Sequence, residues 1–237
     1  MASEHGEAGG AAPGPVVEPA GASVEARAGK LGFVAHEVRN PLSTALWTAE
    51  LMARMSAADR GGARGEKMAE MMLRALGRVR QLFEDHFLSE RLDVGGIPVR
   101  AEPQALGPAV EAAGARRPAD LGELSLVIEP GLSVRADKVL LERLLDLVLA
   151  AAGGEGAPVA LSARRIGPLT RILLEGRPLT EASLADPVKG SPSDMKGRAL
   201  SLPLARRIAA VLGGELRVAG GALELVLPAA LEPAEDV

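Results

Sequence analysis

The most informative stretch of the chain spans residues 31–52, LGFVAHEVRNPLSTALWTAELM. Apolar residues recur there every three or four positions, which predicts a helix with one buried stripe. The stripe consists of Leu31, Val34, Val38, Leu42, Ala45, Ala49 and Met52. We expect the helix to run from Glu25 to Met55 and to be separated from the next element by Gly61-Gly62.

A second amphipathic segment follows these glycines and extends from Gly65 to Leu92. Its apolar face contains Met68, Met72, Leu76, Val79, Phe83 and Phe87. Two long helices joined by a short turn form an antiparallel hairpin, which we assign to residues 25–94. Because a lone hairpin would leave its stripes in water, we expect two copies to form a homodimeric four-helix bundle.

A polar face is predicted on the other side of the first helix. At about 100° per residue, Asn40, Ser43 and Trp47 fall within about 40° of the direction of His36, which should therefore point to solvent. Pro41 removes one helical hydrogen bond, at a cost of about 3 kcal/mol. Strain of this kind beside an exposed histidine is typical of functional sites.

Beyond Gly95-Gly96, which we interpret as a hinge, the periodicity changes. The patterns predict strands at 97–102, 124–129, 158–166, 169–175, 215–218 and 222–227, and helices at 104–115, 137–152 and 199–212. This order indicates an α/β sandwich over residues 97–229, with one sheet covered by about three helices. We expect a long mobile loop at 176–197, a disordered tail at 1–24 and a frayed tail at 230–237.

The composition argues against several classes of function. The 237 residues include 27 Lys and Arg against 31 Asp and Glu, so no strong positive field favours nucleic acid or a membrane surface. The chain has no cysteine, three histidines and 2% aromatic residues, which argues against disulfides, a metal site of its own and base stacking. Without a signal sequence or an apolar stretch of membrane-spanning length, we expect a cytoplasmic protein.

The string HEVRNPLS, residues 36–43, resembles the phospho-acceptor motif of bacterial sensor histidine kinases. Its place on the first helix of a hairpin is similar to their dimerisation and phosphotransfer domain. The order of elements after Gly96 is similar to their ATP-binding domain. The resemblance therefore covers the chain beyond its N-terminal tail and implies that His36 carries a phosphoryl group.

Two nucleotide-binding motifs of that family are altered in this sequence. Asp146 and Ala150 stand where the family's helix carries two asparagines for Mg²⁺ and phosphate. The strand that should end in an adenine-binding Asp-x-Gly-x-Gly instead ends in LLEGRPL, residues 173–179. Either Leu174 or Glu175 takes the place of the acid, depending on the register.

The glycine-rich turn is altered as well. Of its three expected glycines only Gly197 remains, and Ala199 and Ser201 replace the others. Glycines in such turns let backbone N–H groups approach phosphate. With these contacts and the metal ligand lost together, we expect no ATP binding and no autophosphorylation from ATP.

The combination resembles the histidine phosphotransferases of bacterial phosphorelays, which act on receiver domains of response regulators. It implies that His36 accepts a phosphoryl group from one receiver aspartate and passes it to another. Glu37 would orient the imidazole or act as a local base, and Asn40 would hold water for dephosphorylation of the receiver. The protein would need no cofactor of its own, because the receiver supplies Mg²⁺.

Three further residues near His36 are expected to contact the receiver. Arg39 would help neutralise phosphate charge, or be a plain solvated residue. Ser43 and Trp47 share the face of His36, and Trp47 would either anchor the interface or pack against the second helix.

Two other functions stay open from the sequence. The chain could be a non-catalytic pseudokinase that docks on a response regulator or a histidine kinase and regulates it. It could also be a divergent active kinase in which Asp146 binds Mg²⁺ and Glu175 recognises adenine. Substitution of His36 distinguishes the pseudokinase from a phosphotransferase, because only the phosphotransferase needs this histidine. Titration with Mg·ATP distinguishes the active kinase, because only the kinase binds nucleotide.

Overall fold

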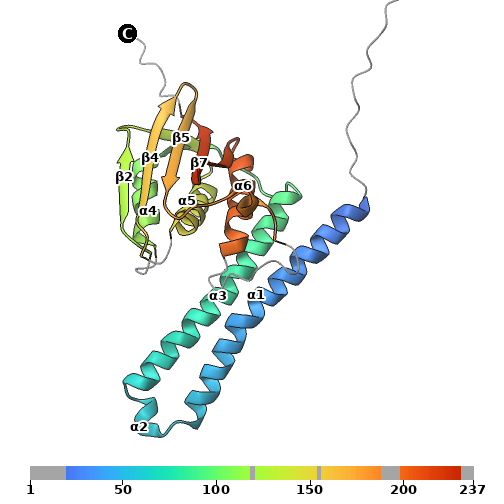
Figure 1. Cartoon of the computed structure of the whole chain (residues 1–237), viewed down its shortest axis with the longest axis vertical. Helices are drawn as coiled ribbons and strands as arrows, with labels where there is room; N and C mark the ends of the chain where they lie inside the picture. The colour runs from blue at the N-terminus through green and yellow to red at the C-terminus, as the bar shows by residue number, and fades with distance from the viewer. Residues whose placement is uncertain (1–19, 118–120, 154–155, 188–197, 231–237) are drawn as a thin grey trace, which may run out of the picture.

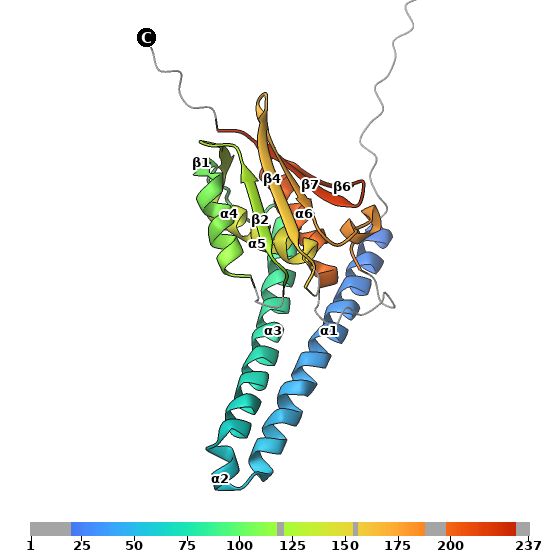
Figure 2. The same cartoon turned by 60° about the vertical axis from the view of Figure 1, so that its left-hand side comes forward.

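The computed structural model describes residues 20–117, 121–153, 156–187 and 198–230. They form a long helical hairpin with an α/β domain packed at one end of it (Figures 1 and 2). This arrangement confirms the predicted fold class. Within the described ranges, no helix is both long and apolar enough to cross a membrane.

The hairpin consists of α1 (Ala20–Arg54) and α3 (Ala63–Asp93), joined by the short α2 (Ala57–Arg60). α1 begins at Ala20 instead of the predicted Glu25, so residues 20–24 belong to the helix and not to the expected tail. The remainder of that tail, residues 1–19, lies outside the described residues.

Each hairpin helix has two apolar faces instead of the single buried stripe that we predicted. Phe33, Val34 and Leu82 are at most 3% exposed and form one apolar cluster between the helices. Several large apolar side chains of the predicted stripes are instead exposed: Leu31, Leu42, Leu76, Phe83 and Phe87. Leu46 and Leu73 are exposed as well. The hairpin therefore closes on itself with a narrow seam and leaves a second apolar face in water.

The main sheet has five strands in the order β2-β4-β5-β7-β6. β2 is parallel to β4, and the other neighbours are antiparallel. The strands are β2 (Leu124–Ile128), β4 (Val159–Ile166), β5 (Leu169–Glu175), β6 (Glu215–Ala219) and β7 (Ala222–Pro228). The predicted hairpin of β6 and β7 turns at Gly220 and Gly221, whose φ angles of 60° and 86° suit a two-residue turn.

A second, two-stranded sheet pairs β1 (Glu102–Ala105) with β3 (Ser133–Ala136). The strand predicted at 97–102 was therefore wrong, because pairing begins only at Glu102. The strand β3 was not predicted, since four residues are too few to show a period of two.

Helices α4 (Leu106–Ala115), α5 (Lys138–Ala152) and α6 (Ser201–Val211) lie on one face of the main sheet (Figures 1 and 2). This confirms the prediction of one sheet covered by three helices. α5 starts at an N-cap, because the Asp137 carboxylate accepts hydrogen bonds from the N–H groups of Val139 and Leu140 at 3.0 and 3.2 Å. Leu144 and Leu145 of this helix are fully buried in the domain core.

Two boundaries in the second half of the chain also differ from prediction. The loop expected at 176–197 contains a 3₁₀ helix, η1 (Glu181–Leu184), and residues 188–197 lie outside the described residues. A second 3₁₀ turn, η2 (Arg198–Leu200), leads into α6. Ala230 belongs to the domain and not to the predicted tail at 230–237, because it is buried and its N–H donates to the carbonyl of Ser133 at 2.9 Å. Residues 231–237 are not among those described.

Candidate functional site

His36 lies in the middle of α1. Its side chain is exposed, as the polar periodicity predicted. Arg39, Asn40 and Ser43 are exposed beside it. Trp47 is 57% exposed, so the alternative that it packs against the second helix was wrong. The predicted site residues on this face therefore form one accessible polar strip.

Glu37 points elsewhere, although it is the next residue. It is only 4% exposed and lines a cavity of about 660 Å³ between α1 and α3. Successive helical side chains diverge by about 100°, so the Glu37 carboxyl group and the His36 imidazole occupy different faces. The expected role of Glu37 as a base beside the imidazole is therefore not supported by where its carboxyl group lies.

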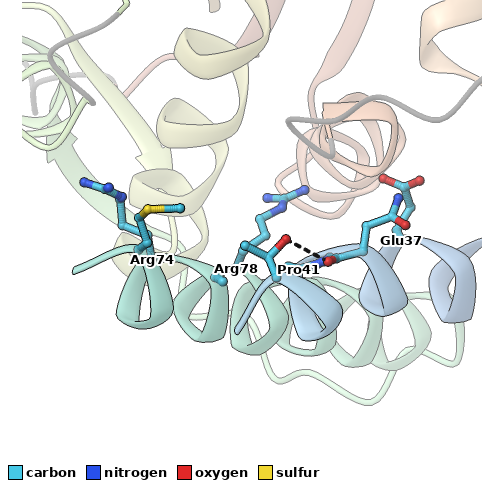
Figure 3. A pocket seen from close by; sticks show the side chains of 8 residues that line it. Glu37, Pro41, Arg74 and Arg78 are labelled. Atoms are coloured by element: carbon cyan, nitrogen blue, oxygen red, sulfur yellow. Dashed lines mark hydrogen bonds between the residues drawn. The ribbon is translucent and has the colours of Figure 1, made fainter. Parts of the chain in front are cut away.

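The cavity beside Glu37 is lined by polar and apolar residues from both helices (Figure 3). Asn40, Pro41 and Thr44 contribute from α1, and Arg74 and Arg78 reach toward it from α3. These arginines were missed by the sequence analysis, because no motif marks them.

Pro41 sits within α1 and does not end it. Proline has no N–H, so the carbonyl of Glu37 lacks its usual helical donor at the wall of this cavity. One turn further on, the Thr44 hydroxyl donates to the carbonyl of Asn40 at 3.1 Å (dashed line in Figure 3). The HEVRNPLS segment therefore has polar groups on the side that lines the cavity as well as on its exposed side.

The α/β domain, here called the sheet domain, contacts the hairpin one turn before His36. Leu200, in the turn before α6, joins the apolar cluster of Phe33, Val34 and Leu82. Leu92 at the end of α3 is part of the core of the sheet domain. The predicted hinge at Gly95-Gly96 therefore does not separate the two parts, because contacts on both sides of it hold them together.

A network of charges surrounds this junction. Lys30, which is 6% exposed, donates to the Ser89 hydroxyl at 2.8 Å and to the Glu90 carboxylate at 3.0 Å, and its Nζ lies 3.6 Å from Asp93. Asp93 in turn accepts a hydrogen bond of 2.7 Å from Arg207 of α6.

Arg207 also forms a bidentate ion pair with Asp186. Burial acts to lower the pKa of Arg207, but its hydrogen bonds to Asp186 and Asp93 outweigh burial and raise that pKa. Burial acts to raise the pKa of Asp186, and the hydrogen bond and charge of Arg207 hold it below its usual value. Both groups are thus charged at neutral pH.

A second charged contact joins α3 to α5. Arg143 of α5 forms an ion pair with Asp85, which is 6% exposed and also accepts a hydrogen bond of 3.0 Å from Gln81. Sequence analysis did not identify these junction residues. A signal was present, because Lys30 lies four residues before the buried Val34 and Asp85 three residues after the buried Leu82, on faces that turn inward.

The helix that resembles the kinase ATP-binding helix is α5, and its Asp146 is already engaged. The carboxylate accepts hydrogen bonds from Nε and Nη2 of Arg116, at 3.2 and 2.9 Å. A divergent kinase would need this carboxylate for Mg²⁺, and here it is paired with Arg116. Across the described ranges, no group of three or more His, Asp or Glu side chains is placed to hold a metal ion.

The two residues that could take the place of the adenine-binding acid lie in different environments at the end of β5. Leu174 is 1% exposed in the core, whereas Glu175 is exposed. The inward position is thus occupied by an aliphatic side chain. Arg177 follows, and its backbone N–H and its Nε donate to the carbonyls of Ala152 and Ala151 at the end of α5, both at 3.0 Å.

The altered glycine-rich turn also has another contact. Ala199 and Leu200 pack against the hairpin cluster, and Ser201 is buried at the start of α6. Gly197 lies outside the described residues. An ion pair, a leucine and an interdomain contact thus occupy the three stretches that resemble nucleotide-binding motifs.

Comparison with known proteins identifies the fold. No protein-family model matches the chain, and no curated protein does. Among solved structures, the Acinetobacter baumannii histidine kinase AdeS is similar with a TM-score of 0.61 and 16% identity, over 84% of this chain and 98% of that one.

Two further histidine kinases are less similar. The mycobacterial sensor histidine kinase MprB matches 56% of this chain and 100% of that chain, with a TM-score of 0.46 and 20% identity. A histidine kinase from Burkholderia phymatum STM815 matches 84% of this chain and 98% of that one, with a TM-score of 0.42 and 17% identity. The likeness to AdeS shows that this chain has a histidine-kinase-like fold, a helical hairpin followed by an α/β domain.

Proposed function

We propose that this protein is a histidine phosphotransferase of a two-component phosphorelay, which moves a phosphoryl group between receiver-domain aspartates through His36 without binding ATP. The observation that carries this proposal is the combination of an exposed His36 in HEVRNPLS with an ion pair, Arg116–Asp146, at the position of the kinase metal ligand. A kinase needs that ligand, whereas a phosphotransferase needs only an accessible histidine.

The transfer is a displacement at phosphorus. A ring nitrogen of neutral His36 attacks the aspartyl-phosphate of the first receiver, the N–P bond forms and the P–O bond to the aspartate breaks. In the second half, the aspartate of another receiver attacks and the imidazole leaves. The receiver supplies Mg²⁺, and this chain contributes position and access.

The exposed neighbours of His36 form the receiver-binding strip in this proposal. Arg39 lies about one helical turn from His36, and Ser43 and Trp47 extend the same face. Asn40 is exposed one turn after His36, where it would orient water for dephosphorylation of the receiver. An Asn40→Ala substitution should then prolong the lifetime of the phosphorylated receiver without preventing labelling of His36.

The proposed active form is a homodimer. The exposed apolar faces of α1 and α3, including Leu42 at 49% and Phe83 at 43%, would be buried when two hairpins form a four-helix bundle. His36 lies about 120° around α1 from the middle of that face, so it stays accessible in such a bundle.

The test uses a purified receiver that has been phosphorylated with ³²P. We expect the chain to take up label from this receiver, and to take up none from Mg·[γ-³²P]ATP. His36→Gln should abolish uptake, while the matched variant His86→Gln, which removes a half-buried histidine of α3, should retain it. Labelling of the His36→Gln protein, or labelling of the parent from ATP, would contradict the proposal.

A second candidate function is regulation by docking alone, and the 57% exposure of Trp47 favours it. In that case His36→Ala would complement a deletion strain as well as the parent gene, while Trp47→Ala would not. If the protein acts by phosphotransfer, His36→Ala should instead fail to complement the deletion strain.

A further inference from the structure

The junction between the hairpin and the sheet domain is attached at separate points. Leu200 contacts the hairpin cluster, Arg143 pairs with Asp85, and Arg207 pairs with Asp93. Along α3 these contacts extend from Leu82 to Asp93, which is about 16 Å of helix at 1.5 Å per residue. Contacts spread over such a length resist rotation of one body on the other, which a single contact would not do.

The chemistry of these contacts opposes separation. Asp85 and Lys30 have side chains only 7% and 8% exposed. Removing one partner from a buried ion pair leaves an uncompensated charge in a poorly solvated place. Arg143 of α5 and Arg207 of α6 form ion pairs between the sheet domain and the hairpin. Lys30 instead pairs with residues of its own hairpin.

The segment of α1 held at the junction is the one that presents His36. Lys30, Phe33 and Val34 occupy the two turns before it, and all three are buried. In contrast, Glu37 and the turns that follow line a cavity between the helices. The docked domain therefore supports α1 on the N-terminal side of His36, next to a loosely packed stretch on the other side.

We propose that the sheet domain is a fixed clamp, which Arg143, Arg207 and Leu200 hold against the hairpin, and which keeps the two turns before His36 in one conformation independently of nucleotide. The clamp gives the domain a role that does not need ATP. It does not depend on phosphotransfer, and its test measures none.

The absence of cysteine allows site-specific spin labelling. Labels at Glu50 on α1 and Arg164 on β4, both exposed and outside the junction, report the distance between hairpin and domain. Labelled chains are diluted with unlabelled chains so that only distances within one chain are measured. We expect one narrow distance distribution, unchanged by Mg·ATP, and a clearly broader one in the Arg143→Gln/Arg207→Gln variant.

The matched control is Arg80→Gln, which breaks an exposed pair with Glu84 within α3 and should leave the distribution narrow. Hydrogen exchange of the amides at 30–36 should rise several-fold in the double variant and not in the control. If the double variant does not fold, Leu200→Ala tests the same clamp through its apolar contact. A broad distribution in the parent, a shift on adding Mg·ATP, or a distribution as narrow as the parent's in the folded junction variants would overturn the proposal.

Discussion

His36 and Glu37 are neighbours in the sequence with opposite environments. His36 is exposed, whereas Glu37 is 4% exposed and faces a cavity that Arg74 and Arg78 also line. A carboxylate in such a place is tolerated only when charged or hydrogen-bonding groups compensate it. Glu37 thus contributes to the packing of the two helices, whereas the imidazole beside it faces solvent.

We therefore predict that Glu37→Gln lowers the free energy of unfolding by about 1–3 kcal/mol, because it weakens the polar contacts of a buried group. Urea denaturation followed by circular dichroism measures this change. The matched variant Glu50→Gln, at an exposed position of the same helix, should alter stability by less than about 0.5 kcal/mol. Equal stability of both variants would contradict a role of Glu37 in the packing of the two helices.

At the scale of elements, the end of β5 approaches the end of α5 very closely at Gly176. A Cβ built there would lie 2.3 Å from the carbonyl oxygen of Ala152. The same carbonyl accepts the N–H of Arg177 at 3.0 Å, so the two backbones are held together at this point. This glycine is thus required by packing, although it belongs to an altered nucleotide motif.

Gly176→Ala is expected to destabilise the protein by about 1–3 kcal/mol, since a backbone must shift to admit the methyl group. Gly77→Ala serves as the control, because nothing lies within 4 Å of its added Cβ and it sits within α3. That substitution should stabilise the protein by about 0.5–1 kcal/mol. The unfolding temperature should therefore fall in Gly176→Ala and rise in Gly77→Ala. A shift of both temperatures in the same direction would contradict the packing role of Gly176.

The main sheet carries a charged cluster on the strand β7. Glu224 is 2% exposed and accepts a hydrogen bond of 2.9 Å from Nε of Arg217, with Arg171 on its other side. The hydrogen bond from Arg217 lowers the pKa of Glu224, burial opposes this, and Arg171 adds to the lowering. Asp186 at the junction has a lowered pKa as well.

These carboxyl groups bind protons more tightly in the unfolded chain, so their contribution to stability is present above the unfolded pKa of about 4 and is lost as the pH falls through the lower folded values. We predict that the urea midpoint falls between pH 5 and pH 3, roughly the range in which carboxyl groups titrate. Glu224→Gln should flatten part of this decline. A decline of the same depth in that variant would show that the β7 cluster does not contribute.

In the whole molecule, the helix α1 has three faces with different surroundings. α1 has a polar strip around His36, a seam against α3 and an apolar face that neither α3 nor the sheet domain covers, including Leu31, Leu42 and Leu46 at 49–61% exposure. Exposed apolar surface of this extent is a strong driving force for association.

Light scattering at micromolar concentration should therefore give about twice 24.4 kDa. Leu42→Glu combined with Phe83→Glu should give a monomer with unchanged helicity, because both side chains lie on the exposed apolar faces. Arg54 is exposed and lies about five helical turns after His36, so it is on the same face of α1, and Arg54→Glu should leave the dimer intact. A parent protein that is monomeric with full helicity would contradict the proposed bundle.

The sequence by itself determined the local features of this protein. The periods of three and four predicted α1 and α3, the alternation of strands predicted β4 and β5, and the polar spacing predicted an exposed His36. The short strands β1 and β3 could not be predicted in this way, since a sheet of four-residue strands is specified by its partners and not by its own pattern.

Only the tertiary structure decided which side of each helix is buried and how the two domains meet. Periodicity identifies an apolar face without saying what covers it, so Leu42 and Phe83 were indistinguishable in the sequence from the buried Val34. The ion pairs Arg143–Asp85 and Arg207–Asp93 join residues that are 58 and 114 positions apart. Such contacts depend on the path of the whole chain, and that is the physical reason why local sequence patterns could not show which residues pair at the junction next to His36.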